Sequence, residues 1–283
     1  MRLLLLGATG FLGRHVAARA AGHEVVSASR RPGTADLWLD TGADPSGLAE
    51  ALRAVRPDAV VNCGGAVDGT PAELVDGNVT AVSRLVEAVR ARGCRLVHVG
   101  SAAEYGTVPV GVPVAETACP QPVGSYGVTK LAGTSLVQTL QDSVVLRVFN
   151  PVGPGAPPSS LPGRVVAQLA GGSSEIRTGP LDATRDYVDV RDVADAILAA
   201  ADSDARGVLN AGSGVPTPSR DLVRTLLALA PGRTLTEEAG GSSRSPAVPW
   251  QQADLTAVTR ALPWKPAFTL RESLLDLLRE EGC

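Results

Sequence analysis

The sequence predicts an α/β fold in which a doubly wound parallel sheet is followed by a smaller C-terminal lobe. The first observation behind this prediction is the alternation of short apolar runs with longer amphipathic segments, which is typical of parallel strands joined by helices. The second is a glycine-rich turn after the first apolar run, and the third is a run of Pro- and Gly-rich connections in the second half of the chain. We expect strands at 2–6, 23–29, 36–40, 58–65, 95–100, 144–149 and 207–211, and intervening helices at 11–21, 45–55, 71–92, 125–141 and 190–201.

The composition is that of a globular chain with one large core. Of 283 residues, 44% are hydrophobic and 19% charged, and 26 basic residues face 29 acidic ones for a net charge of −3. Such a balance offers no basic face for nucleic acid and no polybasic patch for a membrane. The apolar run at 3–6 is too short to span a bilayer, so we expect neither signal peptide nor anchor.

The four cysteines lack the paired spacing of a metal site. They stand apart in the chain, so we expect no metal, reduced thiols and a cytoplasmic location. The positions are Cys63, Cys94, Cys119 and Cys283.

The glycine-rich turn predicts a dinucleotide-binding site. Glycines at three-residue spacing let the backbone approach a pyrophosphate and let the helix pack closely on the strand, while the helix N-terminus faces the anion. An ordinary turn would also contain glycines, but here a helix and a second strand follow, as a Rossmann-type unit requires. The predicted contacts are Gly7, Thr9, Gly10, Phe11, Leu12 and Gly13.

The end of the second predicted strand indicates which cofactor the site selects. An acid here would favour NAD, whereas a basic residue accommodates the 2′-phosphate of NADP. Arg30 and Arg31 stand at this point with no acid beside them, which favours NADP(H), although they could also be solvated loop charges. Asp40, after the third strand, is placed to accept a hydrogen bond from the adenine amino group.

Three residues near the middle of the chain are candidates for catalysis. Ser101 follows the fifth predicted strand, and Tyr126 and Lys130 share one face of the next helix because they are four positions apart. A nearby ammonium lowers the pKa of a tyrosine toward the range of a general acid or base, and a serine hydroxyl can donate to a carbonyl oxygen. Taken alone, the tyrosine and lysine would fit an ordinary amphipathic helix. His98, within the fifth strand, is expected to be structural.

Together these motifs resemble the extended short-chain dehydrogenase/reductase family. The segments at 146–155, 184–194 and 209–214 and Asn78 are similar to its sugar-nucleotide branch. The resemblance implies that Tyr126 is the acid/base, that Lys130 holds the nicotinamide ribose and that Ser101 orients the carbonyl. It also implies a nucleotide-linked sugar as substrate and a homodimer formed through the helices at 71–92 and 125–141.

The resemblance divides the chain into two parts. Residues 1–150 form an NADP-binding domain to which 188–212 return, and 151–187 with 213–283 form a substrate-binding lobe. The segment 239–249 reads either as a mobile edge of the lobe or as a loop. Asn150 and Arg185 are expected at the diphosphate and sugar, with a pair between Arg185 and Asp182 or Asp186 as the alternative.

The residues after Ser101 argue against one activity of the family. Its 4,6-dehydratases carry an acid pair there, whereas this chain has Ala102 and Ala103, which can neither donate nor accept a proton. Glu104 comes one place too late and, in an extended segment, would point to the other side. We therefore expect Ala102 to line the substrate site and to take no part in proton transfer.

Two enzymatic readings and one non-enzymatic reading follow. The sequence favours NADPH-dependent reduction of the 4-keto group of a nucleotide-activated deoxysugar, because a net reductase must exchange its cofactor and Arg30 and Arg31 favour NADP. A 4-epimerase with tightly bound NAD(P) would use the same Ser101, Tyr126 and Lys130. A cofactor-binding sensor or scaffold on the same fold would be expected to lack the tyrosine or the lysine.

Overall fold

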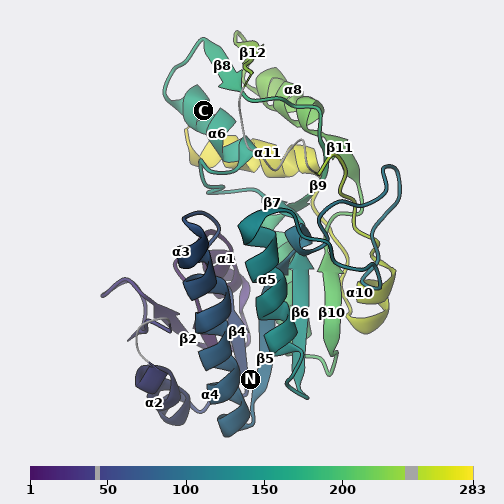
Figure 1. The fold of residues 1–283 in the computed structure, drawn as a ribbon. Helices are drawn as coiled ribbons and strands as arrows, with labels where there is room; N and C mark the ends of the chain where they lie inside the picture. Colours follow the sequence, from purple (N-terminus) through teal and green to yellow (C-terminus); the bar gives the residue numbers. More distant parts are fainter. Residues whose placement is uncertain (42–44, 240–247, 283) are drawn as a thin grey trace.

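The computed structural model describes residues 1–41, 45–239 and 248–282, and its centre is one parallel sheet (Figure 1). The strand order is β10-β6-β5-β4-β1-β2-β3, and every pairing within it is parallel. This is the doubly wound Rossmann-type order, so the predicted fold class is confirmed. The strands are β1 (Arg2–Leu6), β2 (Glu24–Ser29), β3 (Leu37–Trp38), β4 (Ala59–Asn62), β5 (Arg95–Ser101), β6 (Ser143–Val148) and β10 (Gly207–Ala211).

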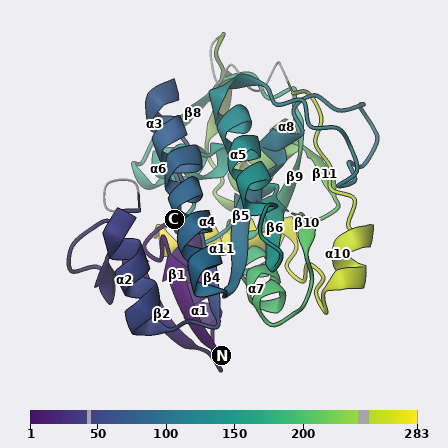
Figure 2. The same ribbon diagram turned by 60° about the horizontal axis from the view of Figure 1, so that its bottom comes forward.

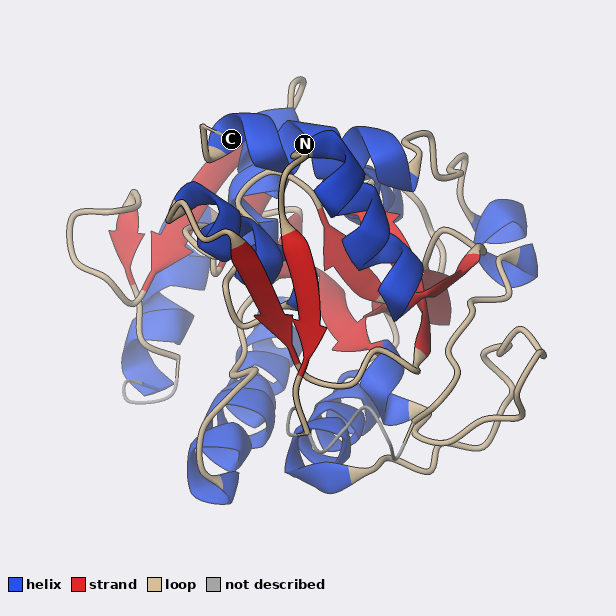
Figure 3. Ribbon diagram, turned by 90° about the horizontal axis from the view of Figure 1, so that it is seen from above, coloured by secondary structure: helices blue, strands red, loops and turns tan. Residues whose placement is uncertain are grey.

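Helices cover both faces of this sheet (Figure 3). Leu3 and Leu5 of β1 face the core shared with α1 (Phe11–Arg19) and α7 (Val190–Ala201). Leu4 and Leu6 face the opposite core, which α2 (Pro45–Val55), α4 (Ala81–Arg92) and α5 (Gly124–Val137) cover. Side chains of a strand alternate between faces, so an unbroken leucine run fills both cores.

A smaller lobe lies beyond the carboxyl end of β6, at the top of Figure 1. In the residues that the structure describes, it contains a three-stranded sheet, a two-stranded sheet and three helices around a third apolar core. Its elements are β7 (Asn150–Val152), α6 (Leu161–Ala170), β8 (Glu175–Thr178), β9 (Thr184–Asp189), β11 (Pro216–Pro218), α8 (Ser219–Leu229), β12 (Thr234–Glu237) and α11 (Leu270–Glu280).

One C-terminal segment leaves the lobe and packs against the large sheet. The short helix α10 (Thr256–Ala261) contacts β10, beside which it lies in Figure 2. Val258, Leu262 and Trp264 belong to the core that also holds the β1 and α7 side chains, and the Trp264 indole donates to the Asp192 carbonyl at 2.8 Å. The two-part division of the chain stays a prediction, and residues 256–264 within its second part pack against the large sheet.

The expected helix at 71–92 is interrupted by one wide turn. It consists of α3 (Pro71–Val75), a π-helical segment η1 (Asp76–Thr80) and α4. The π turn places the buried side chain of Asn78 between two segments. Its amide pairs with the backbone of Ala66 in both directions, at 2.8 and 2.9 Å, and donates to Thr129 of α5 at 3.1 Å.

Three other expectations about elements differ from the structure or lie outside it. The strand expected at 36–40 is reduced to the two residues of β3, and the first of the expected Pro- and Gly-rich connections, at 151–163, includes the end of β7 and the start of α6. Most of the segment 239–249 lies outside the described residues. Within the described part of the chain, no helix is both long and apolar enough to cross a membrane.

Candidate functional site

The glycine-rich turn packs the start of α1 closely against neighbouring backbone. Gly7 has a φ of +74°, and a Cβ there would lie 2.8 Å from the Gly64 amide nitrogen. A Cβ at Gly13 would lie 2.1 Å from the Gly7 carbonyl oxygen, so only glycine allows α1 to pack this closely on β1. Gly10 caps α1 without a side-chain hydrogen bond. The turn therefore fits a pyrophosphate at the helix N-terminus.

The turn after β2 is held by hydroxyl groups and presents two arginines. The Ser29 hydroxyl contacts Thr9 Oγ1 at 3.0 Å and accepts from the Arg31 amide at 3.1 Å. Trp38 donates its indole N–H to the Arg30 carbonyl at 3.1 Å. Both arginine side chains are exposed, and among the described residues neither guanidinium has a carboxylate partner. Asp40 lies two residues past β3, at the same edge of the sheet.

Ser101 is the last residue of β5 and opens the 3₁₀ turn η2 (Ala102–Glu104). The Ala103 amide donates to the Ser101 hydroxyl oxygen at 3.2 Å. This contact uses a lone pair of the oxygen, so the hydroxyl proton stays available for an acceptor beyond the strand. Ala102 is buried beside it.

Helix α5 carries Tyr126 and Lys130 against the same end of β5. Lys130 is buried and donates from Nζ to the Val99 carbonyl at 2.6 Å, two residues before Ser101. A Cβ at Gly127 would lie 2.6 Å from the Ala103 carbonyl oxygen, so the first turn of α5 touches η2. The half-buried Tyr126, which directly precedes Gly127, thus stands next to the Ser101 segment.

Burial shifts the pKa values of Lys130 and of the ionisable groups around it. It lowers the pKa of Lys130 itself, and the charge of Glu104 acts in the opposite direction. Burial also raises the pKa of the Cys63 thiol to about 12, which makes this cysteine a poor nucleophile. It lowers the pKa of His98 well below its usual value, and His98 Nδ1 contacts the Asn62 amide at 3.0 Å inside the sheet. His98 therefore has the structural place expected of it.

The lobe residues Asn150 and Arg185 lie on neighbouring strands of the three-stranded sheet. Asn150 is paired in register with Tyr187, and its amide donates to the Asp186 carbonyl at 3.0 Å. The Arg185 guanidinium donates to the Thr184 carbonyl at 2.9 Å, and burial lowers its pKa.

The alternative role for Arg185 is not observed. Asp182 pairs with Arg220 at 3.2 Å, and the Asp186 carboxylate accepts from the backbone of Ser213 and Gly214. Neither carboxylate is paired with Arg185, so the guanidinium keeps its charge for another anion.

Glu104 occupies a place that the sequence did not predict. The segment after Ser101 is helical rather than extended, and the Glu104 side chain is fully buried under the site. It forms an ion pair of 2.8 Å with Arg147 of β6. The signal in the sequence was Arg147 itself, because a charge inside a buried apolar strand requires a buried partner.

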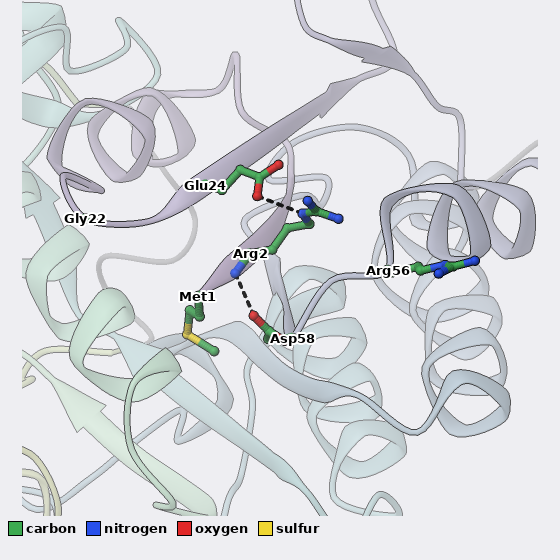
Figure 4. Close-up of a pocket in the computed structure, with 6 residues that line it drawn as sticks. All are labelled: Met1, Arg2, Gly22, Glu24, Arg56 and Asp58. Atoms are coloured by element: carbon green, nitrogen blue, oxygen red, sulfur yellow. Dashed lines mark hydrogen bonds and ion pairs between the residues drawn. The ribbon is translucent and has the colours of Figure 1, made fainter.

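A separate hollow lies at the opposite edge of the sheet (Figure 4). Both carboxylates of this hollow are held by Arg2, whose amide donates to Asp58 at 2.7 Å and whose guanidinium forms an ion pair with Glu24 at 2.9 Å. Ligands of open α/β sheets bind at the carboxyl ends of the strands, and this hollow surrounds the amino end of β1. It is not the candidate site.

The fold and the site define an NAD(P)-dependent oxidoreductase. The chain belongs to the NAD dependent epimerase/dehydratase family, whose model matches residues 3–212. It is 39% identical to dTDP-6-deoxy-L-talose 4-dehydrogenase (NAD(P)(+)) of Kitasatospora kifunensis, covering 98% of this chain and 94% of the relative. It is 28% identical to GDP-6-deoxy-D-mannose reductase of Pseudomonas aeruginosa, over 99% and 96% of the two chains.

A solved structure agrees with these sequence matches. The structure of RMD from Pseudomonas aeruginosa complexed with NADPH matches with a TM-score of 0.87 at 26% identity, over 99% of this chain and 98% of that one.

Proposed function

We propose that this enzyme reduces the 4-keto group of a nucleotide-activated 6-deoxy sugar with NADPH. The observation that carries the proposal is the meeting of Ser101 and the Tyr126–Lys130 helix at the end of β5, with alanines where a dehydratase would hold acids. Two relatives whose names specify 6-deoxy sugar nucleotides support the substrate class.

The protein's own residues donate the proton and bind the substrate. NADPH, when bound, would supply the hydride to the carbonyl carbon. Lys130 holds the ribose and makes Tyr126 a stronger acid, Ser101 and Tyr126 both donate to the keto oxygen, and the developing alkoxide takes the tyrosine proton. Arg185 and Asn150 bind the diphosphate and the sugar, and Ala102 lines the sugar subsite.

Cofactor selection is assigned to the turn after β2. Charge-assisted hydrogen bonds from Arg30 and Arg31 to the 2′-phosphate should contribute about 1.5–3 kcal/mol. Replacing both by alanine should therefore weaken NADPH binding by about tenfold to a hundredfold and leave NADH nearly unchanged, as measured by fluorescence titration. Arg206→Ala, at an exposed position between α7 and β10, is the control. Equal losses for the two cofactors would contradict the assignment.

The other proposed contacts are those to the rest of the cofactor, to the sugar nucleotide and to a second copy of the chain. Gly7, Thr9, Gly10, Phe11, Leu12 and Gly13 hold the pyrophosphate, and Asp40 meets the adenine. The lobe binds the sugar nucleotide, and two copies pair through the helices at 71–92 and 125–141. Light scattering at micromolar protein would oppose the dimer if it gave the mass of one chain.

A 4-epimerase is the second candidate, because the family includes epimerases and they would use the same three residues. One assay separates the two. A nucleotide-linked 4-keto-6-deoxy sugar with NADPH is offered in one vial, and a nucleotide-linked hexose without reductant in another. Oxidation of NADPH in the first supports the reductase. Turnover in the second vial alone, giving the C4 epimer, would establish the epimerase instead.

A further inference from the structure

The proposed reaction leaves unexplained a carboxylate buried directly beneath it. Glu104 has no exposed surface, and its two oxygens accept three hydrogen bonds. Oε1 accepts from the Ser101 amide at 2.8 Å and from the Thr134 hydroxyl at 3.0 Å, and Oε2 accepts from Arg147 Nε at 2.8 Å. A buried charge is costly, so a chain that keeps one usually gains something besides stability from it.

The three donors belong to three elements that meet at the site. Ser101 ends β5, Arg147 lies in β6, and Thr134 lies on α5. Thr134 is four residues after Lys130 and eight after Tyr126, so it lies on the helix face that carries both. The carboxylate therefore connects the Ser101 segment to the face of α5 that holds the other two candidate groups.

The contacts around Glu104 leave it little freedom to move. A Cβ at Gly100 would lie 2.7 Å from Glu104 Oε1, so the strand passes against the carboxylate. On the far side the Arg147 guanidinium stacks over the Tyr105 ring, 4.4 Å from its centre. The Tyr105 hydroxyl in turn donates to Asn210 of β10 at 2.7 Å. The carboxylate is thus anchored across the sheet as far as β10.

We propose that Glu104 is a positioning residue, which sets the Ser101 hydroxyl and the α5 face that carries Tyr126 and Lys130 in their reactive arrangement. This inference rests on the proposed function. The residue touches neither substrate nor cofactor. Its effect is geometric through Ser101 and Thr134, and electrostatic through Lys130.

The electrostatic effect depends on the groups that face Lys130. These are Cys63 at the end of β4, His98 on β5 and Glu104 on η2, with Tyr126 on its own helix. Burial lowers the pKa of both His98 and Lys130, and burial raises that of Cys63. Glu104 thus supplies a counter-charge that favours the protonated form of Lys130 and opposes the effect of burial on its pKa.

The test replaces the charge while keeping the shape. In Glu104→Gln, kcat with the keto sugar should fall by about tenfold to a hundredfold, since small misplacements of reacting groups have effects of this size. The KM of the sugar should change little, and the alkaline limb of the kcat profile should move to lower pH because Lys130 loses its proton sooner. Glu50→Gln, at an exposed position of α2 away from the site and from the proposed dimer helices, is the matched control.

A second variant separates positioning from stability. Glu104→Gln leaves the Arg147 charge buried without its partner, which destabilises the fold. In Glu104→Gln with Arg147→Met that charge is also gone, so urea unfolding should show regained stability while kcat stays low. Recovery of kcat together with stability, or a wild-type kcat and pH profile in Glu104→Gln, would overturn the proposal.

Two milder variants, at Thr134, test the proposal if the Glu104→Gln protein does not fold. Thr134→Val removes only the donor from α5 and should lower kcat, and Thr134→Ser should restore it. Equal kcat values in the two variants would count against positioning through α5.

NADPH binding distinguishes this inference from the proposed function. If the wild type fails to reduce any 4-keto sugar nucleotide, the proposed function fails. The pH dependence of NADPH affinity still tests Glu104, because that titration needs no sugar. Affinity in Glu104→Gln should decline at lower pH than in the wild type, and coincident curves would contradict the role of Glu104.

Discussion

Tyr126 and Lys130 have separable parts in the proposed chemistry, since only Tyr126 loses a proton to the product. Tyr126→Phe should lower kcat by about 10²–10⁴-fold, the range expected for one general acid. Its affinity for NADPH should be unchanged, because Lys130 remains in place. Stopped-flow hydride transfer and fluorescence titration give the two values. A kcat within a few-fold of the wild type would remove Tyr126 from the proton transfer.

The buried ammonium gives the reaction a pH limit. Because burial lowers the pKa of Lys130, the group loses its proton at a lower pH than an exposed lysine, whose pKa is about 10.4. Reduction requires both the protonated Tyr126 and the charged Lys130, so kcat should be constant near neutrality and decline at alkaline pH. A pH profile of kcat measures this limb. Lys130→Met, which has no titrating amine, should be slower throughout and lack the Lys130 contribution to the decline.

At the level of elements, strong local patterns were predictable and long-range adaptations were not. The leucine run of β1 and the glycine spacing before α1 each fix a structure within a few residues, so both were predicted correctly. The π turn η1 has no local signature, because it depends on Asn78 reaching Ala66 and Thr129 in other segments. The place of Glu104 likewise depends on Arg147, 43 residues later. Motif spacing predicts the residues of the candidate site. The buried carboxylate of Glu104 beneath them has no local signal in the sequence, because its partner comes from another strand.

The π turn yields a prediction about stability. Asn78→Ala would leave the Ala66 backbone groups and Thr129 without their side-chain partner, at a cost of about 2–3 kcal/mol in the free energy of unfolding. Urea denaturation measures the loss. Val110→Thr, at an exposed loop position, is the control and should be nearly neutral. Comparable values for the two variants would show that the π turn is not maintained by Asn78.

At the scale of the whole molecule, the chain crosses between its two parts more than twice. Trp264 is buried in the core that α1 and α7 form against the large sheet, although it follows most of the lobe in sequence. Trp264→Ala should lower stability by about 3–5 kcal/mol, the usual effect of truncating a buried aromatic side chain. Calorimetry should show one transition at a lower temperature. A separate transition for the lobe at its original temperature would show that α10 does not couple the two parts.

The return of α10 and Trp264 to the large sheet also limits how this enzyme can be re-engineered. A chimera that exchanged the whole of 213–283 for the corresponding stretch of a relative would import foreign side chains into the core beneath β10, where Val258, Leu262 and Trp264 now pack. The core side chains of the recipient and of the donor would then have to pack together in a region remote from the proposed sugar site. A chimera that keeps 256–264 native and exchanges only the flanking segments avoids this mismatch. Changes in sugar preference are therefore best sought by exchanging two separate segments of the lobe.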